Sequence, residues 1–241
     1  MKMENPRRRP VVVILGGGLS GGATAFHLAR ILPPEAVDIV VVEPRPTLGA
    51  GLAYSTDEPA HRINVPAAKM TLIASDLDHF TAWLAAERRY LSPGTLTLRG
   101  DLFPERRVFG QYVTSCIAPF LATGAIRHLR AEALSAALVG ERYLIDLSDG
   151  SSIGADFLVL AMSHPLPGLP AELQGLAGSP RLVADPYDNR RIAAIGPSDR
   201  VLIVGTGLTS ADVVASLCRR GFWVSSSPCR GTGCGRAGTG L

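Results

Sequence analysis

Residues 11–21 read VVVILGGGLSG, and this stretch determines the fold class. Its first five residues form an unbroken aliphatic run, which is typical of a strand buried on both faces in a parallel sheet. The pattern G-x-G-x-x-G follows at Gly16, Gly18 and Gly21. The first glycine allows a tight turn, the second lets a pyrophosphate approach the backbone, and the third lets the helix pack closely on the strand. The stretch therefore predicts a dinucleotide-binding turn, where the N–H groups and dipole at the helix start stabilise the anion.

The residues after the glycines complete a βαβ unit. A helix is expected over Ser20 to Leu32, before the stop at Pro33-Pro34, and Asp38 to Glu43 (DIVVVE) is expected to be a second buried strand. Glu43 ends this strand about 20 residues beyond Gly21, where a carboxylate can accept hydrogen bonds from adenosine ribose hydroxyls. A carboxylate there repels a 2′-phosphate, so NADP is disfavoured at this first site. The alternative is a glycine-rich turn with a surface glutamate.

A second strand, turn and helix repeat the first arrangement. Val201 to Val204 is expected to be a strand, and Gly205-Thr206-Gly207 follows, with Ala211 in place of a third glycine. A helix is expected from about Thr209 to Arg220. The pattern indicates a second nucleotide-binding turn, and the alternative is an ordinary βα turn in which Thr209 caps the helix.

The segments between the two glycine motifs also mix helix and strand, while residues 49–75 show no clear period. The expected elements are helices over Asp76–Tyr90 and Phe109–Leu121, and strands over Ile126–Leu134, Tyr143–Leu147 and Phe157–Ala161, with a turn at Asp149-Gly150 between the last two. Residues 163–198 are rich in Pro and Gly and are expected to be a connection. The order of elements predicts an α/β, Rossmann-like three-layer fold with a partial second Rossmann unit.

Composition limits the class of protein. The 241 residues suit one large domain or two modest ones, and 46% hydrophobic with 19% charged residues allows a sizeable core. Part of the net charge of +3 comes from Arg7, Arg8 and Arg9, a short run typical of a solvated tail rather than of nucleic-acid binding. No apolar stretch reaches the ~18 residues that span a bilayer, and the first apolar run breaks at Gly16, too early for a secretory signal. We therefore expect a cytoplasmic protein with a small-molecule substrate and no membrane or nucleic-acid partner.

The cysteines point to neither metal nor disulfide chemistry. Cys116, Cys218, Cys229 and Cys234 form no CxxC pair, and no histidine lies at zinc-finger spacing from them. No metal site or disulfide framework is therefore expected.

Three stretches carry a resemblance to a known family: VVVILGGGLSGGATAFHLAR, VVVEPRPTLGAGLAYSTDEPAHRINVPA and VLIVGTGLTSADV. They are similar to bacterial FAD/NAD(P)-binding flavoproteins, which include FAD-dependent urate hydroxylases and aspartate N-monooxygenases. The resemblance spans about residues 10–222, and Leu48 to Pro66 is its most specific part. It implies that the first Rossmann unit holds FAD and that the second holds NADPH or NADH.

The resemblance also implies which residues contact the cofactors. The first glycine turn would hold the FAD phosphates, Glu43 the ribose, and Arg45 would lie near the adenosine. Residues 61–66 (HRINVP) would approach the flavin ring, although a loop salt bridge or a capping contact explains His61 and Arg62 equally well. The cofactor-binding residues so implied are Gly16, Gly18, Leu19, Ser20, Gly21, Glu43, Arg45, Arg62, Asn64, Gly205 and Gly207.

One turn departs from the family pattern. After the strand that ends near Ala161, related flavoproteins often have a glycine-containing turn such as Ala-Thr-Gly, whereas this chain continues Met162-Ser163-His164-Pro165. Ser163 stands at the usual glycine position, which disfavours a close approach of FAD to the backbone there. His164 could touch the flavin, but a loop histidine beside a proline is more often structural.

These patterns divide the chain into three parts. An FAD-binding Rossmann domain with helical and β insertions covers 10–198, a partial NAD(P)-binding unit covers 199–224, and a disordered tail outside the family pattern covers 225–241. Back-translation of residues 222–240 in another reading frame permits LGLVVAVSRHGLRPRGHG, in which LVVAV would supply the next strand of the second unit. We therefore hypothesise a frameshift or sequence error near codon 222, and the arginine after the restored strand would favour NADPH.

Three functions fit these features. The first is an NAD(P)H-dependent flavin monooxygenase or hydroxylase that acts on a small nitrogen-containing molecule. The second is a truncated FAD-binding protein without turnover, and the third is an NAD-dependent dehydrogenase with one Rossmann unit. The second glycine motif and the segment GLAYSTDEPAHRINVPA disfavour the third function. No side chain can be named as a catalytic acid, base or nucleophile.

Overall fold

The computed structural model describes residues 8–163 and 168–222. His164, the tail over 225–241 and the hypothesis of a frameshift into that tail lie outside these residues. The chain forms two compact units, one of Met1–Asp57 with Arg62–His164 and one of Glu58–His61 with Pro165–Leu241. The predicted three-part division remains a prediction.

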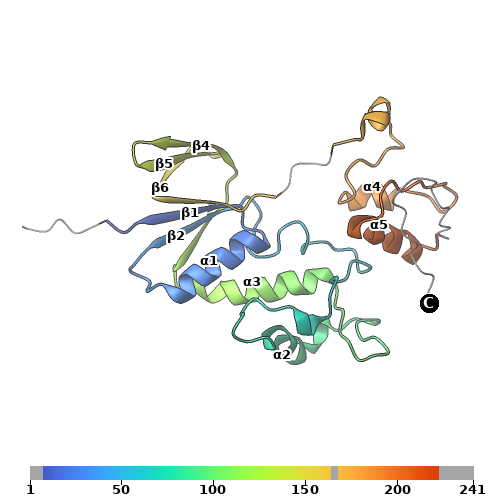
Figure 1. Cartoon of the computed structure of the whole chain (residues 1–241), viewed down its shortest axis with the longest axis horizontal. Coiled ribbons are helices and arrows are strands. Elements are labelled where there is room, and N and C mark those ends of the chain that lie inside the picture. The colour runs from blue at the N-terminus through green and yellow to red at the C-terminus, as the bar shows by residue number, and fades with distance from the viewer. Residues whose placement is uncertain (1–7, 164–167, 223–241) are drawn as a thin grey trace, which may run out of the picture. The chain divides into compact units, whose positions relative to one another are not determined.

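A four-stranded parallel sheet in the order β3-β2-β1-β7 forms the centre of the first unit (Figure 1). β1 (Val11–Leu15) and β2 (Asp38–Val42) lie in the middle, and β3 (Ile126–Leu129) and β7 (Phe157–Leu160) lie at the edges. The two central strands are almost entirely buried. Their continuous aliphatic sequences are therefore buried on both faces of the sheet, as such runs predict.

Two different layers cover the faces of this sheet (Figure 1). On one face, α1 (Leu19–Ile31) and α3 (Arg106–Ala122) pack on alternate residues of β1 such as Ile14. On the other face, Val13 packs with side chains of an antiparallel sheet of β4 (Ala133–Val139), β5 (Arg142–Leu147) and β6 (Ser152–Ala155). The predicted α/β three-layer fold is confirmed.

Several predicted boundaries in this unit are wrong. The helix expected over Asp76–Tyr90 is shorter, because the backbone at Glu87 leaves helical geometry; α2 covers His79–Ala86 and the 3-10 turn η2 covers Arg88–Tyr90. α3 begins at Arg106, before the predicted Phe109, since the arginines at its start add no apolar periodicity. A second 3-10 turn, η1, covers Ala67–Lys69.

The strand expected over Ile126–Leu134 is in fact two strands. β3 ends at Leu129, and the N–H of Ala131 donates to the Leu129 carbonyl, which turns the chain out of the parallel sheet and into β4. Apolar and polar residues alternate across this turn, from Leu129 to Ala133, as they do in a strand, so the sequence gives no sign of it. β6 was not predicted.

The second unit contains η3 (Ala171–Leu176), α4 (Asn189–Ala193) and α5 (Leu208–Arg219). Arg219 pairs with Glu58, at 2.7 Å from its Nε to Oε1, and so ties residues 58–61 to α5. Arg220 donates to the Ile192 and Ala193 carbonyls and so satisfies the end of α4.

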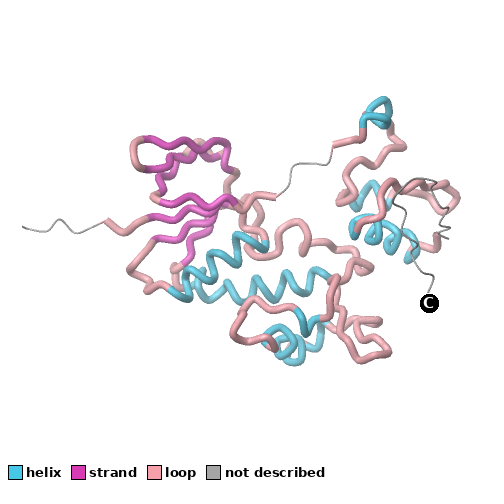
Figure 2. Tube along the Cα trace, in the orientation of Figure 1, coloured by secondary structure: helices cyan, strands magenta, loops and turns pink. Residues whose placement is uncertain are grey.

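The strand predicted over Val201–Val204 does not form. In the described part of this unit no other strand is assigned (Figure 2), so the segment has no neighbour for its ladder hydrogen bonds. Leu202 is 84% exposed and Val204 is 64% exposed. The sequence has the apolar character of a buried strand, but the described residues supply no sheet for it to join.

Among the described residues, no helix has the length and apolar character needed to cross a membrane.

An aromatic cluster between α2 and α3 supports the helical layer, and Tyr112 lies at its centre. Tyr112 is fully buried and its ring lies 4.8 Å from that of Phe80. Its hydroxyl accepts a hydrogen bond from the Leu72 N–H at 3.1 Å and lies 2.7 Å from Nδ1 of His79. Burial raises the pKa of Tyr112, so the phenol stays protonated and joins a loop to both helices.

The change Tyr112→Phe tests the role of this hydroxyl. It keeps the ring but leaves the Leu72 N–H and the His79 ring nitrogen without their partner. We expect the free energy of unfolding, measured by urea denaturation, to fall by about 1–3 kcal/mol. Tyr143→Phe in β5 is the control, because within the described chain its hydroxyl makes no hydrogen bond. Equal losses in the two variants would contradict the assignment.

Candidate cofactor site

The first glycine turn joins the carboxyl end of β1 to α1, and its backbone is closely enclosed. Gly16 has a φ of 96°, in the left-handed region that favours glycine. Its N–H donates to the Val42 carbonyl at 2.9 Å, which fixes the turn to β2. A Cβ at this position would lie 2.5 Å from the Ala161 carbonyl oxygen. Only glycine fits this position, as the motif predicts.

Two further glycines of the turn have equally little room. A Cβ at Gly21 would collide with the Gly16 carbonyl, so α1 packs directly on the turn. A Cβ at Gly17 would collide with the Leu48 side chain and lie 2.8 Å from Cβ of Glu43. The motif treats Gly17 as a free position, so the sequence pattern missed this requirement.

The start of α1 is open to a ligand. Gly18 is its N-cap, and no side chain in the described chain caps the helix. The N–H groups of Leu19, Ser20 and Gly21 therefore have no acceptor within the helix, and Ser20 is exposed. An anion such as a pyrophosphate fits here, because it meets free donors, the positive end of the helix dipole and no side chain at Gly18.

Glu43 has a contact that the sequence did not predict. Its carboxylate is buried at the end of β2, where Oε2 accepts from the Gly17 N–H at 2.8 Å and Oε1 from Arg45 Nε at 2.9 Å. Burial alone would raise the pKa of Glu43, but the hydrogen bonds from Arg45 and Gly17 together hold it below its ordinary value. Glu43 therefore fixes the glycine turn to β2. Ribose binding by Glu43, with the half-exposed Arg45 near the adenosine, remains a prediction.

Residues 61–66 do not form one cluster of side chains. His61 belongs to the second unit, where its Nε2 lies 3.0 Å from the Ser216 hydroxyl on α5. The guanidinium of Arg62 donates to the Phe103 and Pro93 carbonyls, both at 2.8 Å. Asn64 is exposed, and its Oδ1 accepts from Arg106 at 3.0 Å. Arg62 therefore anchors a loop, which is the alternative the sequence left open for it, and Arg106 was missed.

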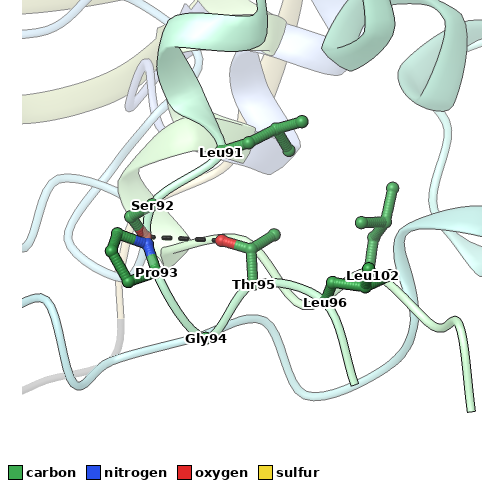
Figure 3. Close-up of a pocket in the computed structure, with 7 residues that line it drawn as sticks. All are labelled: Leu91, Ser92, Pro93, Gly94, Thr95, Leu96 and Leu102. Atoms are coloured by element: carbon green, nitrogen blue, oxygen red, sulfur yellow. Dashed lines mark hydrogen bonds between the residues drawn. The ribbon is translucent and has the colours of Figure 1, made fainter. Parts of the chain in front are cut away.

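The loop that Arg62 anchors borders a shallow cavity of about 440 Å³ (Figure 3). Arg62 also donates to the buried Thr95 hydroxyl, which in turn bonds to Ser92. The lining is mostly apolar and consists of Leu91, Ser92, Pro93, Gly94, Thr95, Leu96 and Leu102. Since its hydroxyls are already paired, the cavity offers apolar surface rather than a catalytic group.

The second glycine turn has the same backbone as the first but no enclosing neighbours. Gly205 has a φ of 115°, and Gly207 is the N-cap of α5. Counted from the first helical residue, Ser210 rather than Ala211 holds the place of Gly21, which corrects the alignment of the third position. Thr209 does not cap this helix. Among the described residues, no atom would lie within 4 Å of a Cβ at Gly205 or Gly207, and no strand packs on this turn.

The remaining predictions concern Ser163, the cysteines and metal binding. Ser163 is exposed, and the Ala161 carbonyl before it forms the wall against Gly16. Cys116 and Cys218 are free thiols, and the other two cysteines lie outside the described residues. Within the described residues no cluster of three or more His, Cys, Asp or Glu could hold a metal ion.

Comparison with known proteins agrees with this geometry. A family model described as FAD-NAD(P)-binding matches residues 13–165, which include the first glycine turn and all of the parallel sheet except the first two residues of β1. The chain belongs to the FAD-NAD(P)-binding family. FAD and NAD(P) are therefore its cofactors. A search of curated proteins finds no match.

Several solved structures are partly similar to this chain. The chain is 18% identical to the ornithine N-hydroxylase of Kutzneria sp. 744, with a TM-score of 0.50, over 68% of this chain and 39% of that one. It is 16% identical to OTEMO in complex with FAD and NADP, with a TM-score of 0.43, over 70% of this chain and 28% of that one. For FqzB the identity is 14% and the TM-score 0.43, over 71% of this chain and 40% of that one. The chain thus spans well under half the length of these proteins, and the likeness shows the fold alone.

The change Glu43→Gln tests the attachment of the glycine turn. Gly17 and Arg45 donate to different carboxylate oxygens, and an amide has only one oxygen, so glutamine can replace only one of these two acceptors. We therefore expect the free energy of unfolding near neutral pH to fall by about 2–3 kcal/mol. Because the folded pKa is lowered, the contribution of Glu43 is fully present above its ordinary pKa of 4.5 and is lost as the pH falls through the folded value.

The difference between wild type and Glu43→Gln should therefore shrink in acid, as urea unfolding at several pH values would measure. Glu141→Gln, at an exposed hairpin position, serves as the control. A difference that stays constant from neutral pH into acid would contradict this role.

Proposed function

We propose that the chain binds FAD in the turn between β1 and α1 and acts as an NAD(P)H-dependent flavin monooxygenase or hydroxylase on a small nitrogen-containing molecule. The enclosed glycine turn is the observation that carries the proposal. Side chains at Gly16 and Gly21 would strike backbone atoms, while Gly18 leaves the helix start open. Such a turn binds a pyrophosphate.

The chain's own residues supply binding and orientation. The N–H groups of Leu19, Ser20 and Gly21 would bind the pyrophosphate, Glu43 would accept from the ribose while it holds the turn, and Asn64 would meet the flavin end. The turn at Gly205 and Gly207 would bind the NAD(P)H phosphates. When bound, FAD supplies the exchange of hydride with NAD(P)H and the activation of O₂, chemistry that no side chain provides.

The proposed substrate class is a small nitrogen-containing molecule. Its support is the resemblance of residues 48–66 to flavoproteins that include aspartate N-monooxygenases. The Kutzneria enzyme, which shares the fold, was solved with reduced FAD, NADP⁺ and L-ornithine. Both are N-hydroxylation systems, so amino acids and related amines are the first substrates to test.

A second candidate is an FAD-binding protein without turnover. The surroundings of the second glycine turn favour it: in the described part of the chain no atom would lie within 4 Å of a Cβ at Gly205 or Gly207, and Val204 is exposed. A nicotinamide dinucleotide could contact the backbone of this turn, but the described residues would supply few further contacts. Yellow protein that does not oxidise NADH or NADPH, with or without amines, would establish this candidate and remove the first. A single-site NAD-dependent dehydrogenase is disfavoured by the family match.

Matched alanine changes in the two turns test the assignment of cofactors. Gly18 and Gly207 have extended backbones that alanine can adopt. A Cβ at Gly18 would lie 3.3 Å from the Gly51 Cα, so the loop at Gly51 must shift slightly, and urea unfolding of Gly18→Ala checks that the variant folds. A methyl group at Gly18 would stand between the pyrophosphate and the backbone. We expect Gly18→Ala to raise the Kd for FAD at least about tenfold, or 1.4 kcal/mol. Flavin absorbance and fluorescence titration would measure it.

Gly207→Ala is the control in this pair. It should leave the Kd for FAD unchanged and weaken NAD(P)H, read as a higher KM for NAD(P)H oxidation. A colourless wild-type protein that takes up no added FAD would overturn the proposal. So would an equal affinity of wild type and Gly18→Ala for FAD.

A further inference from the structure

One face of α3 contacts three successive parts of the chain between β2 and residue 64. Arg106, Gly110 and Thr114 are four residues apart, so they lie on one side of the helix, about 6 Å apart along its axis. α3 runs beside α1 beneath the parallel sheet (Figure 1). The contacts of these three residues show what this face does.

The contact at Thr114 reaches the pyrophosphate turn. Its hydroxyl donates to the Leu48 carbonyl at 2.7 Å. The N–H of the next residue, Gly49, donates to the Gly17 carbonyl at 2.8 Å. Two hydrogen bonds in series therefore join this point of α3 to the glycine turn.

The contact at Gly110 holds the middle of the connection. A Cβ on Gly110 would collide with the Tyr54 carbonyl and lie 3.0 Å from Cβ of Ala50, so this loop packs directly on the helix backbone. Gly51, within the same loop, lies against Gly18; a Cβ on Gly51 would be 2.9 Å from the Gly18 Cα. The helix, the loop and the glycine turn are thus in continuous contact.

The contact at Arg106 holds the far end. Arg106 is only 8% exposed; its Nε donates to the Arg62 carbonyl at 3.2 Å and its Nη2 to Oδ1 of Asn64 at 3.0 Å. The other edge of this segment is fixed by the Ile63 N–H, which donates to the Pro104 carbonyl at 3.2 Å. Asn64 is therefore held from two sides.

This arrangement orients the Asn64 amide. Since its Oδ1 accepts from Arg106, the exposed NH₂ remains as the donor that Asn64 can offer to a ligand. The position of Arg106 does not favour the helix itself, because a cation at the first helical residue opposes the dipole. Its neighbour Arg107, by contrast, is half-exposed and pairs with Glu105.

We propose that Arg106 is a positioning residue for the flavin: it holds the Asn64 amide at a fixed separation from the pyrophosphate turn, so that the amide NH₂ donates to an acceptor atom of the isoalloxazine ring. This inference rests on the proposed FAD site and adds a residue to it. Arg106 acts through Asn64, while α3 sets the distance between the two ends of the cofactor site.

The test compares Arg106→Met, Asn64→Ala and the double variant, with Arg127→Met, at an exposed position of β3, as the control. The readouts are the flavin absorbance maximum and fluorescence of FAD-saturated protein, together with the Kd for FAD. Both single variants should shift the spectrum in the same direction, toward that of free FAD, and raise the Kd by about fivefold, the effect of one hydrogen bond. The double variant should add nothing, because the two residues act as one unit. Arg127→Met should match wild type.

The outcomes separate the two proposals. Wild-type protein that binds no FAD overturns the proposed function itself. A wild type that binds FAD, with Arg106→Met or Asn64→Ala retaining its spectrum, overturns only the role of Arg106, as do additive effects in the double variant. If Arg106→Met does not fold, Arg106→Lys and Asn64→Ala decide the matter: Arg106→Lys should restore the wild-type spectrum at least in part, and an unchanged spectrum in Asn64→Ala overturns the inference.

Discussion

The close approach of α1 to the end of β1 is the constraint on which the rest of the first unit depends. Helix and strand meet with backbone against backbone, because Gly21 lies on the Gly16 carbonyl and Gly16 lies on the Ala161 carbonyl. This contact sets how near α1 lies to the sheet, and α3 then packs on α1. It also leaves the helix N–H groups uncovered. The same contact therefore produces the layer arrangement and the anion site.

The two glycine turns have similar backbone geometry but differ in the residues that surround them. Gly16 and Gly205 both have a positive φ, and Gly18 and Gly207 both precede a helix. Within residues 8–163 and 168–222, only the first turn has a sheet behind it, which supplies Ala161 and the buried carboxylate of Glu43. The glycine pattern sets the backbone of a turn, whereas packing neighbours convert it into a binding surface.

The elements that were predicted correctly are those whose structure depends on residues close to one another in the sequence. β1, α1 and β2 follow from two aliphatic runs and a glycine pattern, and the structure confirms that they are strand, helix and strand. Predictions failed where distant partners decide the outcome. The same kind of aliphatic run forms a strand at Val11 and a loop at Val201, because among the described residues the first run alone has strands beside it. The contact of Arg106 with Asn64 joins residues far apart in the sequence, and no local sequence pattern predicts such a contact.

The three confined glycines of the first turn differ in what confines them, and this difference governs how the turn could evolve. Gly16 and Gly21 are limited by carbonyl groups, which every residue type carries, so no second mutation can make room for a side chain there. Gly17 is limited by the side chains of Leu48 and Glu43. A smaller residue at Leu48 would remove the shorter of these contacts, and the Glu43 side chain, with its Cβ 2.8 Å away, would then have to shift. A second mutation can therefore compensate for a substitution at Gly17 but not for one at Gly16 or Gly21, although all three positions lie within one short turn.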